Sequence, residues 1–384
     1  MAHKWPSTER EFLRKFPDLA LFTIQDLPPE LKTYSGSAWS AKHLQACRVL
    51  VEDYNQDLPI LNQFAGTATN IIGANESLLA SLGQFSRDQL RTFPHRKLRN
   101  NPFASFFVSL ADVAREGSYE RPFRLLRHDT RIPERPNFRS GEGEGFSSSP
   151  AGGSSPYTIG SLYSPGQQNE APDFEEQIDR KKHETVSANM AAQFISVILD
   201  LYSNHATEFV STEFDNAPNT FYLKTSQLNC ICQDDGAIWR RKFNPVTRAW
   251  LNVESKLLCS LEAKSSYSRS DNIGVGAISY QDLGQQFCEL LGPVLSQVQD
   301  GDFEALEHQN RRRFLISVHQ SDVTIAYCEF SMEYLSYIYS EQRPQHLPYI
   351  TMHRSRKYDL CDSTERRLAA QAIVTLAEHF NSSI

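Results

Sequence analysis

The sequence lacks the patterns that mark membrane and secreted proteins. No run of about 18 apolar residues occurs in it, so a transmembrane helix is not expected. The first residues, Met-Ala-His-Lys-Trp-Pro-Ser-Thr-Glu, have no apolar core of the kind that a signal peptide needs. We therefore expect an intracellular protein, in the cytoplasm or the nucleus, without a membrane partner.

Cysteine is scarce and is not arranged for metal or redox chemistry. The 7 cysteines are scattered among apolar residues, and no Cys-x-x-Cys pair occurs. This spacing gives no support to a zinc ribbon or a thiol redox motif. We expect buried, reduced thiols, as in most intracellular proteins.

Several common catalytic motifs are also missing. The sequence has no Gly-x-Ser-x-Gly elbow, no P-loop and no His-Glu-x-x-His, and its 11 histidines lack metal-ligand spacing. Gly274 and Gly276 resemble the start of a dinucleotide loop, but the third glycine is absent. Each missing motif is typical of one enzyme class, so the absences argue against a serine hydrolase, a P-loop nucleoside triphosphatase, a zinc protease and a dinucleotide-dependent enzyme.

A basic overall charge is absent as well. The net charge is -7 and the sequence pI is about 5.9, so the chain has no overall attraction to nucleic acid. A DNA or RNA partner would have to meet local basic clusters, which occur at 240–242, 311–313 and 353–357. Ordinary solvated charge is the competing interpretation of each cluster.

The composition divides the 384 residues into three parts. Residues 1–127 are predicted to be mostly helical, and the apolar spacing predicts a long helix over 44–64. Residues 128–172 are rich in Gly, Ser and Pro, which predicts a disordered linker. Residues 173–384 are predicted to form one α/β domain.

The predicted order within the third part is helix, several strands, helix, strand pair and helix. Acidic residues open the first helix, which is expected to end near Tyr202. The last helix is capped by Asp362 or Ser363. The predicted elements between them are strands over 221–225, 228–232, 238–243, 249–253 and 257–264, a helix over 279–298, and a hairpin over 313–319 and 323–330.

The strand predicted over 257–264 carries two charges in an unusual place. Its sequence is Leu-Leu-Cys-Ser-Leu-Glu-Ala-Lys, so the strand is apolar until Glu262 and Lys264. Because side chains alternate along a strand, these two project to the same face. Buried charges must be paired with each other, with a metal or with a ligand. A simple ion pair without catalytic function is the plainer interpretation.

A second acidic site precedes Gly236, at Asp234 and Asp235. If the strands beginning at 228 and 257 are neighbours, Asp235 and Glu262 can converge on one Mg²⁺ or Mn²⁺. Mg²⁺ usually takes one or two carboxylates, waters and phosphate oxygens. Asp234 is the alternative ligand, and we favour Asp235 because it stands directly before the glycine. Lys264 would stabilise or help to deprotonate the attacking water.

These residues resemble the motif of the PD-(D/E)xK nuclease superfamily, also called restriction-endonuclease-like, and are most similar to nuclease-like domains of uncharacterised fungal proteins. The resemblance covers about 173–384 and lacks the proline that names the motif. It implies an α-β-β-β-α-β core, a mixed sheet flanked by helices, and metal-dependent phosphodiester hydrolysis. It rests on Asp234-Asp235-Gly236, Leu261-Glu262-Ala263-Lys264, Gln285 with Glu289, and Tyr358-Asp359-Leu360.

The resemblance implies two further site residues. The first helix of the superfamily often contributes a glutamate, for which Glu184 is the candidate, and Gln285 lies on the helix after Lys264. A solvated helix position is the competing interpretation of both. The alternative function is an inactive nuclease fold that binds nucleic acid or protein.

Overall fold

The computed structural model describes residues 4–19, 21–116, 174–203, 210–244, 246–264, 278–298, 306 and 308–382. Residues Met1–Ser118 and Asp179–Ile384 belong to one compact unit. The linker predicted over 128–172 lies outside the described residues. No helix in the described ranges is long and apolar enough to span a bilayer.

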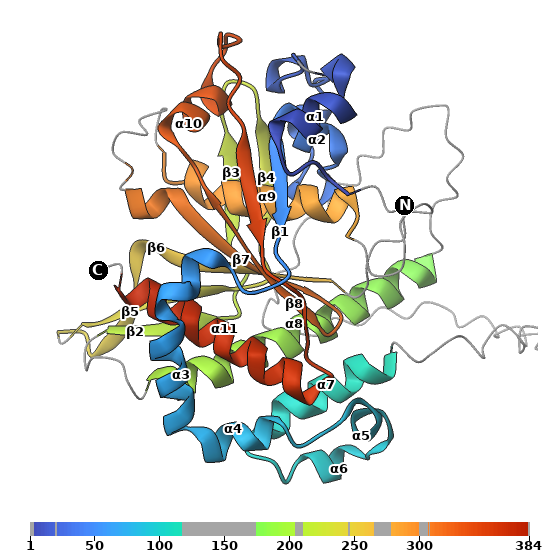
Figure 1. Cartoon of the computed structure of the whole chain (residues 1–384), viewed down its shortest axis with the longest axis vertical. Coiled ribbons are helices and arrows are strands. Elements are labelled where there is room, and N and C mark those ends of the chain that lie inside the picture. Colours follow the sequence, from blue (N-terminus) through green and yellow to red (C-terminus); the bar gives the residue numbers. More distant parts are fainter. Residues whose placement is uncertain are drawn as a thin grey trace, which may run out of the picture. The chain divides into compact units, whose positions relative to one another are not determined.

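A mixed sheet of eight strands forms the centre of the unit (Figure 1). Two neighbouring pairs, β1 with β9 and β6 with β7, are parallel, and the other pairs are antiparallel. In spatial order the strands are β1 (Val49–Asp53), β9 (Ile350–Arg354), β8 (Asp322–Glu329), β7 (Arg312–His319), β6 (Ala249–Lys264), β5 (Ala237–Asn244) and β2 (Val210–Asp215), with β10 (Tyr358–Asp359) beside β8.

Helices cover both faces of the sheet, and a core lies on each face. One core contains Leu261 and Ile316 together with α3 (Ala65–Ala74), α8 (Phe174–Ser203) and α11 (Ser363–Ser382). The other contains Leu257 and Leu315 together with α9 (Tyr280–Leu295) and α10 (Met332–Tyr339). Figure 1 shows these two groups of helices on opposite sides of the strands. Burial on both faces explains the short apolar runs at 257–259 of β6 and 314–316 of β7.

The remaining elements surround this three-layer arrangement. A two-stranded sheet of β3 (Thr220–Lys224) and β4 (Asn229–Gln233) packs against α9. The other helices are α1 (Glu9–Lys15), α2 (Ala41–Ala46), α4 (Glu76–Leu82), α5 (Arg87–Thr92), α6 (His95–Leu98) and α7 (Ala104–Glu116). Short 3-10 segments are η1 (Pro17–Leu19), η2 (Ile24–Asp26), η3 (Leu31–Thr33), η4 (Gly36–Ala38), η5 (Pro59–Phe64) and η7 (His308–Arg311).

Helix α9 lies between the sheet and the β3–β4 pair and is buried along almost its whole length. Its start is fixed by a capping box, in which Ser279 and Asp282 exchange side-chain and backbone hydrogen bonds. Two glycines allow the close packing. A Cβ atom at Gly284 would lie 2.9 Å from the carbonyl of Trp39, and one at Gly292 would lie 2.5 Å from Sγ of Cys232.

Most elements predicted for 173–384 are present. The predicted helices correspond to α8, α9 and α11, the hairpin to β7 and β8, and the apolar strand to the end of β6. The mixed α/β class with a mixed sheet flanked by helices is therefore correct. The strands expected over 249–253 and 257–264 are one long strand, in which the pairing with β5 shifts register.

The helix predicted over 44–64 is wrong. Helix α2 ends at Ala46, Arg48 adopts a positive φ of 53°, and β1 follows as an edge strand beside β9. The condition that the strands beginning at 228 and 257 are neighbours is not met, because β4 belongs to the separate two-stranded sheet and the strands beside β6 are β5 and β7.

Candidate active site

Glu262 and Lys264 lie side by side at the end of β6. Nζ of Lys264 is 2.7 Å from Oε1 of Glu262. The Glu262 residue is only 3% exposed, while the Lys264 side chain is 21% exposed. The face of the sheet that carries this pair is covered by α9, and we refer to it as the site face. The ion pair therefore has one buried end and one end that reaches solvent.

Asp235 is placed against this pair by the main chain. The Asp235 backbone N–H donates to the carbonyl of Leu261 at 2.8 Å, and the Leu261 N–H donates to the carbonyl of Gly236 at 2.8 Å. In addition, Oδ2 of Asp235 accepts a hydrogen bond of 2.8 Å from the N–H of Ala263, the residue between Glu262 and Lys264. Asp235 thus converges on the site although β4 is not the neighbour of β6.

Gly236 makes this connection possible. Its φ is 142°, a conformation that side chains disfavour, and a Cβ there would lie 2.8 Å from the carbonyl of Asp215. The tight backbone turn at Gly236 carries the chain directly from Asp235 into β5.

Asp234 has a different environment and a structural role. Its carboxylate is buried and accepts hydrogen bonds from the backbone N–H of Asn219 at 2.7 Å, the Asn219 amide at 3.1 Å and the N–H of Gly236 at 3.3 Å. Burial raises the pKa of Asp234 to about 7 despite these donors. Of the two neighbouring aspartates, Asp235 is the one in contact with the Glu262–Lys264 segment.

Helix α9 contributes a buried amide and a second buried glutamate. Nε2 of Gln285 donates to Oε1 of Glu262 at 2.5 Å and to Oε1 of Glu289 at 2.9 Å. Glu289 is 1% exposed, and its carboxyl group is hydrogen-bonded to that of Glu262. At the next position of the helix, Nε2 of Gln286 donates to Oγ of Ser317 at 2.7 Å. Polar side chains of α9 therefore bind both β6 and β7.

Glu184, on α8, is half-buried and close enough to act on the site electrostatically. Its charge contributes to raising the pKa of Asp235 and of Lys264. No direct bond from Glu184 to either residue is found in the described part of the chain. The structure thus brings together Asp235, Glu262, Lys264 and Gln285 by contact, and Glu184 by charge.

The pKa values of the site follow from burial and mutual charge. Burial raises the pKa of Glu262 to about 7, with Asp235 adding to the shift and Lys264 opposing it. Burial and the neighbouring Glu262 also raise the pKa of Glu289 well above its ordinary value. Burial works against the Lys264 ammonium, but the Glu262 carboxylate outweighs it and raises the pKa of Lys264. At neutral pH, Lys264 is a cation and not a base.

The carboxylates of the site could hold a hard divalent cation only if water molecules supplied most of its ligands. Asp235 and Glu262 offer two carboxylates, whereas Glu289, whose pKa is raised well above its ordinary value, is hydrogen-bonded to Glu262. Within the described residues, no group of three or more His, Cys, Asp or Glu side chains is arranged to hold a metal ion. Mg²⁺ usually keeps several waters and binds one or two carboxylates. It therefore fits these residues better than a metal that must be surrounded by protein ligands.

Comparisons with family models, curated proteins and solved structures find no match to this chain. The site therefore has to be interpreted from its own geometry.

The basic clusters at 240–242 and 311–313 are largely used within the protein. The guanidinium of Arg240 donates to the carbonyl of Phe380, and that of Arg313 donates to the carbonyl of Leu257 at 2.9 Å. Two further arginines of these clusters form ion pairs. Arg241 lies 2.7 Å from Glu213 and 3.0 Å from Asp215, and Arg312 lies 2.5 Å from Glu329. These clusters do not form an open basic groove.

The cluster at 353–357 is similarly paired. Arg354 binds Asp53 at 2.8 Å, Arg356 binds Glu365, and Lys357 lies 4.0 Å from Asp322. His353 contacts Glu52 at 3.1 Å. Most of the positive charge noted in the sequence is thus balanced by a nearby carboxylate.

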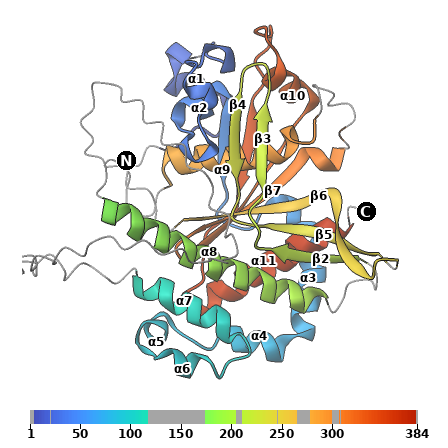
Figure 2. The ribbon, with the colours of Figure 1, turned by 180° about the vertical axis from the view of Figure 1, so that it is seen from behind.

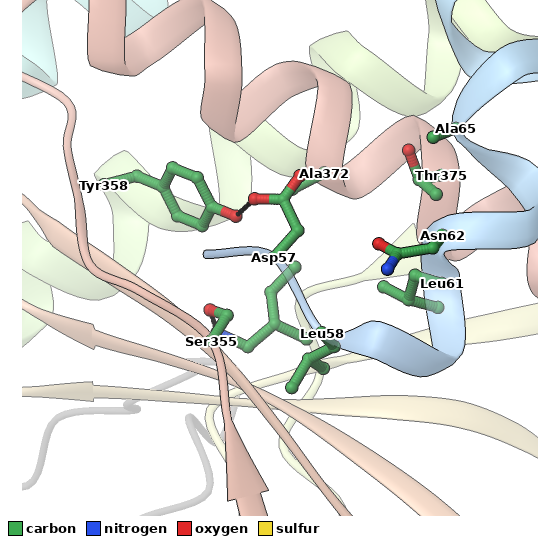
Figure 3. A pocket seen from close by; sticks show the side chains of 10 residues that line it. Asp57, Leu58, Leu61, Asn62, Ala65, Ser355, Tyr358, Ala372 and Thr375 are labelled. Atoms are coloured by element: carbon green, nitrogen blue, oxygen red, sulfur yellow. Dashed lines mark hydrogen bonds between the residues drawn. The ribbon is translucent and has the colours of Figure 1, made fainter. Parts of the chain in front are cut away.

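A small hollow lies away from the site, on the opposite face of the sheet (Figure 3). Asp57, Ser355, Tyr358 and Thr375 are among the residues that line it, and the Tyr358 hydroxyl donates to Asp57. Its free space holds about one water molecule. We regard this hollow as a hydration site and not as a substrate pocket.

The Gln286–Ser317 bridge is the site-face contact that the sequence did not identify, and Glu289 was named beside Gln285 in the motif without a role of its own. Glu289 stands four residues after Gln285, so both lie on one face of α9. That spacing was the available signal. The contact of Gln286 with Ser317 had none, because it depends on how α9 packs across the sheet.

Proposed function

We propose that this protein is a metal-dependent nuclease that hydrolyses phosphodiester bonds. The observation that carries the proposal is the convergence of Asp235 with Glu262 and Lys264, since Oδ2 of Asp235 is bound by the N–H of the residue between the other two. Two carboxylates and an ammonium on adjacent strand ends are the residue types that this hydrolysis needs.

The order of elements supports the same proposal. Helix α8 precedes the antiparallel strands β2, β5 and β6, and α9 then leads to β7, which is parallel to β6. This is a helix, three antiparallel strands, a helix and a parallel strand, the order that the nuclease superfamily resemblance implies. The β3–β4 pair is an insertion between β2 and β5.

Each residue has a distinct role in the proposed reaction. Asp235 and Glu262 would hold Mg²⁺ or Mn²⁺, which when bound supplies positive charge to the phosphate and acidifies water. Lys264 places a fixed ammonium beside Glu262, where it can neutralise charge that develops on the phosphate. Gln285 holds the Glu262 carboxylate in place. Glu184 adds negative charge near Asp235 and Lys264.

The second candidate is a binding module that retains the fold without cleaving. It is favoured by the near-complete burial of Glu262 and by its engagement with both Lys264 and Gln285, which leave little room for a cation. The two candidates differ in whether the protein cleaves nucleic acid when a divalent metal ion is added.

The test is cleavage of single-stranded DNA, duplex DNA and RNA by the purified full chain, with Mg²⁺, with Mn²⁺ and with chelator. We expect metal-dependent cleavage that falls by at least about a hundredfold in Glu262→Gln and Lys264→Ala. Gln281→Ala, an exposed position on α9, is the control and should cleave normally. Absence of cleavage by the wild type, or equal cleavage by the variants, would favour the binding module.

A further inference from the structure

The hairpin formed by β5 and β6 carries aromatic side chains on the site face. Along β5, side chains alternate between the two faces of the sheet. Ile238 packs in the core beneath α11 and Arg240 donates to Phe380 of that helix, so both point away from the site. Trp239 packs against the core that contains α9. Phe243, four residues further, therefore also lies on the site face.

Trp250 extends this row onto the neighbouring strand. It is the register partner of Phe243, and the two ring centroids are 5.6 Å apart. Trp239 and Phe243 are half-buried, and Trp250 is 41% exposed. In Figures 1 and 2 the end of this hairpin projects past α3 and α11. A row of aromatic rings thus runs from the site to the end of the hairpin.

The charge along this row does not favour contacts with a duplex backbone. Arg241, which lies between Trp239 and Phe243, is held by both Glu213 and Asp215. Among the hairpin side chains whose burial the structure describes, the exposed cations are Lys242 and Arg248. Duplex binding depends chiefly on many phosphate contacts, whereas single strands bind by stacking bases on aromatic rings. The row has the rings and few available cations.

We propose that Trp239, Phe243 and Trp250 form a stacking track that binds single-stranded nucleic acid and leads it to the Asp235–Glu262–Lys264 site. This inference rests on the proposed nuclease function and specifies its substrate as single-stranded. At about 3.3 Å per strand residue, Phe243 lies roughly 25 Å from Asp235 along β5, a length that several nucleotides would occupy.

Binding is measured without cleavage, so that the two proposals can fail separately. A fluorescent oligodeoxythymidine of about a dozen nucleotides is titrated with the full chain in chelator, alongside a duplex of equal length. The wild type should bind the single strand at least about tenfold more tightly than the duplex. Trp250→Ala should weaken single-strand binding by roughly five- to a hundredfold, and Trp250→Phe, which retains a ring, by less.

Leu251→Ala is the matched control. Leu251 is 48% exposed at the same level of the hairpin, but it is paired with Lys242 and lies on the opposite face. The Leu251→Ala variant should bind the single strand with the same affinity as the wild type. The logarithm of the binding constant should fall with the logarithm of salt concentration with a slope of only about -1 to -2, because few phosphates are neutralised.

The track is overturned if the wild type does not bind the single strand, or if it binds duplex equally well. Unchanged binding by Trp250→Ala, or a salt slope steeper than about -4, also overturns it. If the binding pattern holds but metal-dependent cleavage is absent, the track stands and the nuclease function fails. If cleavage occurs and Trp250→Ala binds and cleaves like the wild type, the nuclease stands without the track.

Discussion

Nζ of Lys264 lies 2.7 Å from Oε1 of Glu262, and Gln285 donates to that same oxygen atom from the opposing helix. One carboxylate oxygen therefore accepts from both sides of the interface between the sheet and α9. This arrangement fixes Glu262 in one position and offsets the cost of burying it.

Gln285→Ala is expected to destabilise the fold. The substitution removes the amide that donates to both Glu262 and Glu289, and buried acceptors without donors cost about 1–3 kcal/mol. Urea unfolding followed by circular dichroism measures the change. Gln281→Ala, in the exposed first turn of the same helix, should change the free energy of unfolding by less than about 0.5 kcal/mol. Equal effects of the two variants would contradict the network.

Asp235→Asn and Asp234→Asn are expected to have opposite profiles. Asp235 touches the Glu262–Lys264 segment, so under the proposed nuclease function its amide variant should lose at least about a hundredfold in metal-dependent cleavage and remain folded. Asp234 accepts from the backbone of Asn219 and Gly236, so its variant should lose roughly 1–3 kcal/mol of stability. Cleavage rates and thermal unfolding of the same preparations separate the two effects. Loss of cleavage in folded Asp234→Asn alone would reverse the assignment.

Gly236→Ala is expected to lower stability by about 1–3 kcal/mol or more, because the new Cβ meets the Asp215 carbonyl and the φ is unfavourable. Gly66→Ala provides the comparison. Gly66 lies in α3, and apart from its chain neighbours and the backbone of its own helix no atom lies within 4 Å of the place that its Cβ would take, so alanine should stabilise the helix by up to about 1 kcal/mol. Both are measured as shifts of the urea midpoint, and a stabilised Gly236→Ala would contradict the strained turn.

His379 is expected to make the fold acid-sensitive. Burial among the rings of Phe64 and Phe314 lowers the pKa of His379 to about 4, with Arg312 adding to the shift. The unfolded chain, whose histidine has a pKa near 6.5, binds the proton first as the pH falls. This contribution to stability is therefore present above pH 6.5 and is lost progressively between about pH 6.5 and 4.

The measurement is the free energy of unfolding of wild type and His379→Gln at several pH values across this window. The variant should lose less stability on acidification than the wild type. Parallel pH curves for the two proteins would show that His379 does not carry the effect.

The local sequence pattern was sufficient to predict an element where the spacing of its apolar residues matches the face that it buries. The end of β6 was predictable because an apolar run stops at Glu262 and Lys264, and α9 because its apolar residues recur at helical spacing. Asp235 was identified by the glycine that follows it. Each of these signals lies within a few residues of the feature that it predicts.

Features that depend on distant partners were not predictable. The apolar spacing around Leu44 and Val51 favours a helix, but pairing with β9 makes the second part a strand. The basic clusters could not be recognised as ion-paired, since Arg241 meets Glu213 and Arg354 meets Asp53 only after folding. Tertiary contacts decided these cases against local preference.

The pairing of β1 with β9 also bears on how the protein folds during synthesis. Asp53 meets Arg354 across 301 residues of chain. At about 5–20 residues per second, a ribosome takes roughly 15–60 seconds to make that stretch. Throughout this interval Val49 and its neighbours lack the strand with which they pair, so we expect this edge of the sheet to form only after β9 has been synthesised.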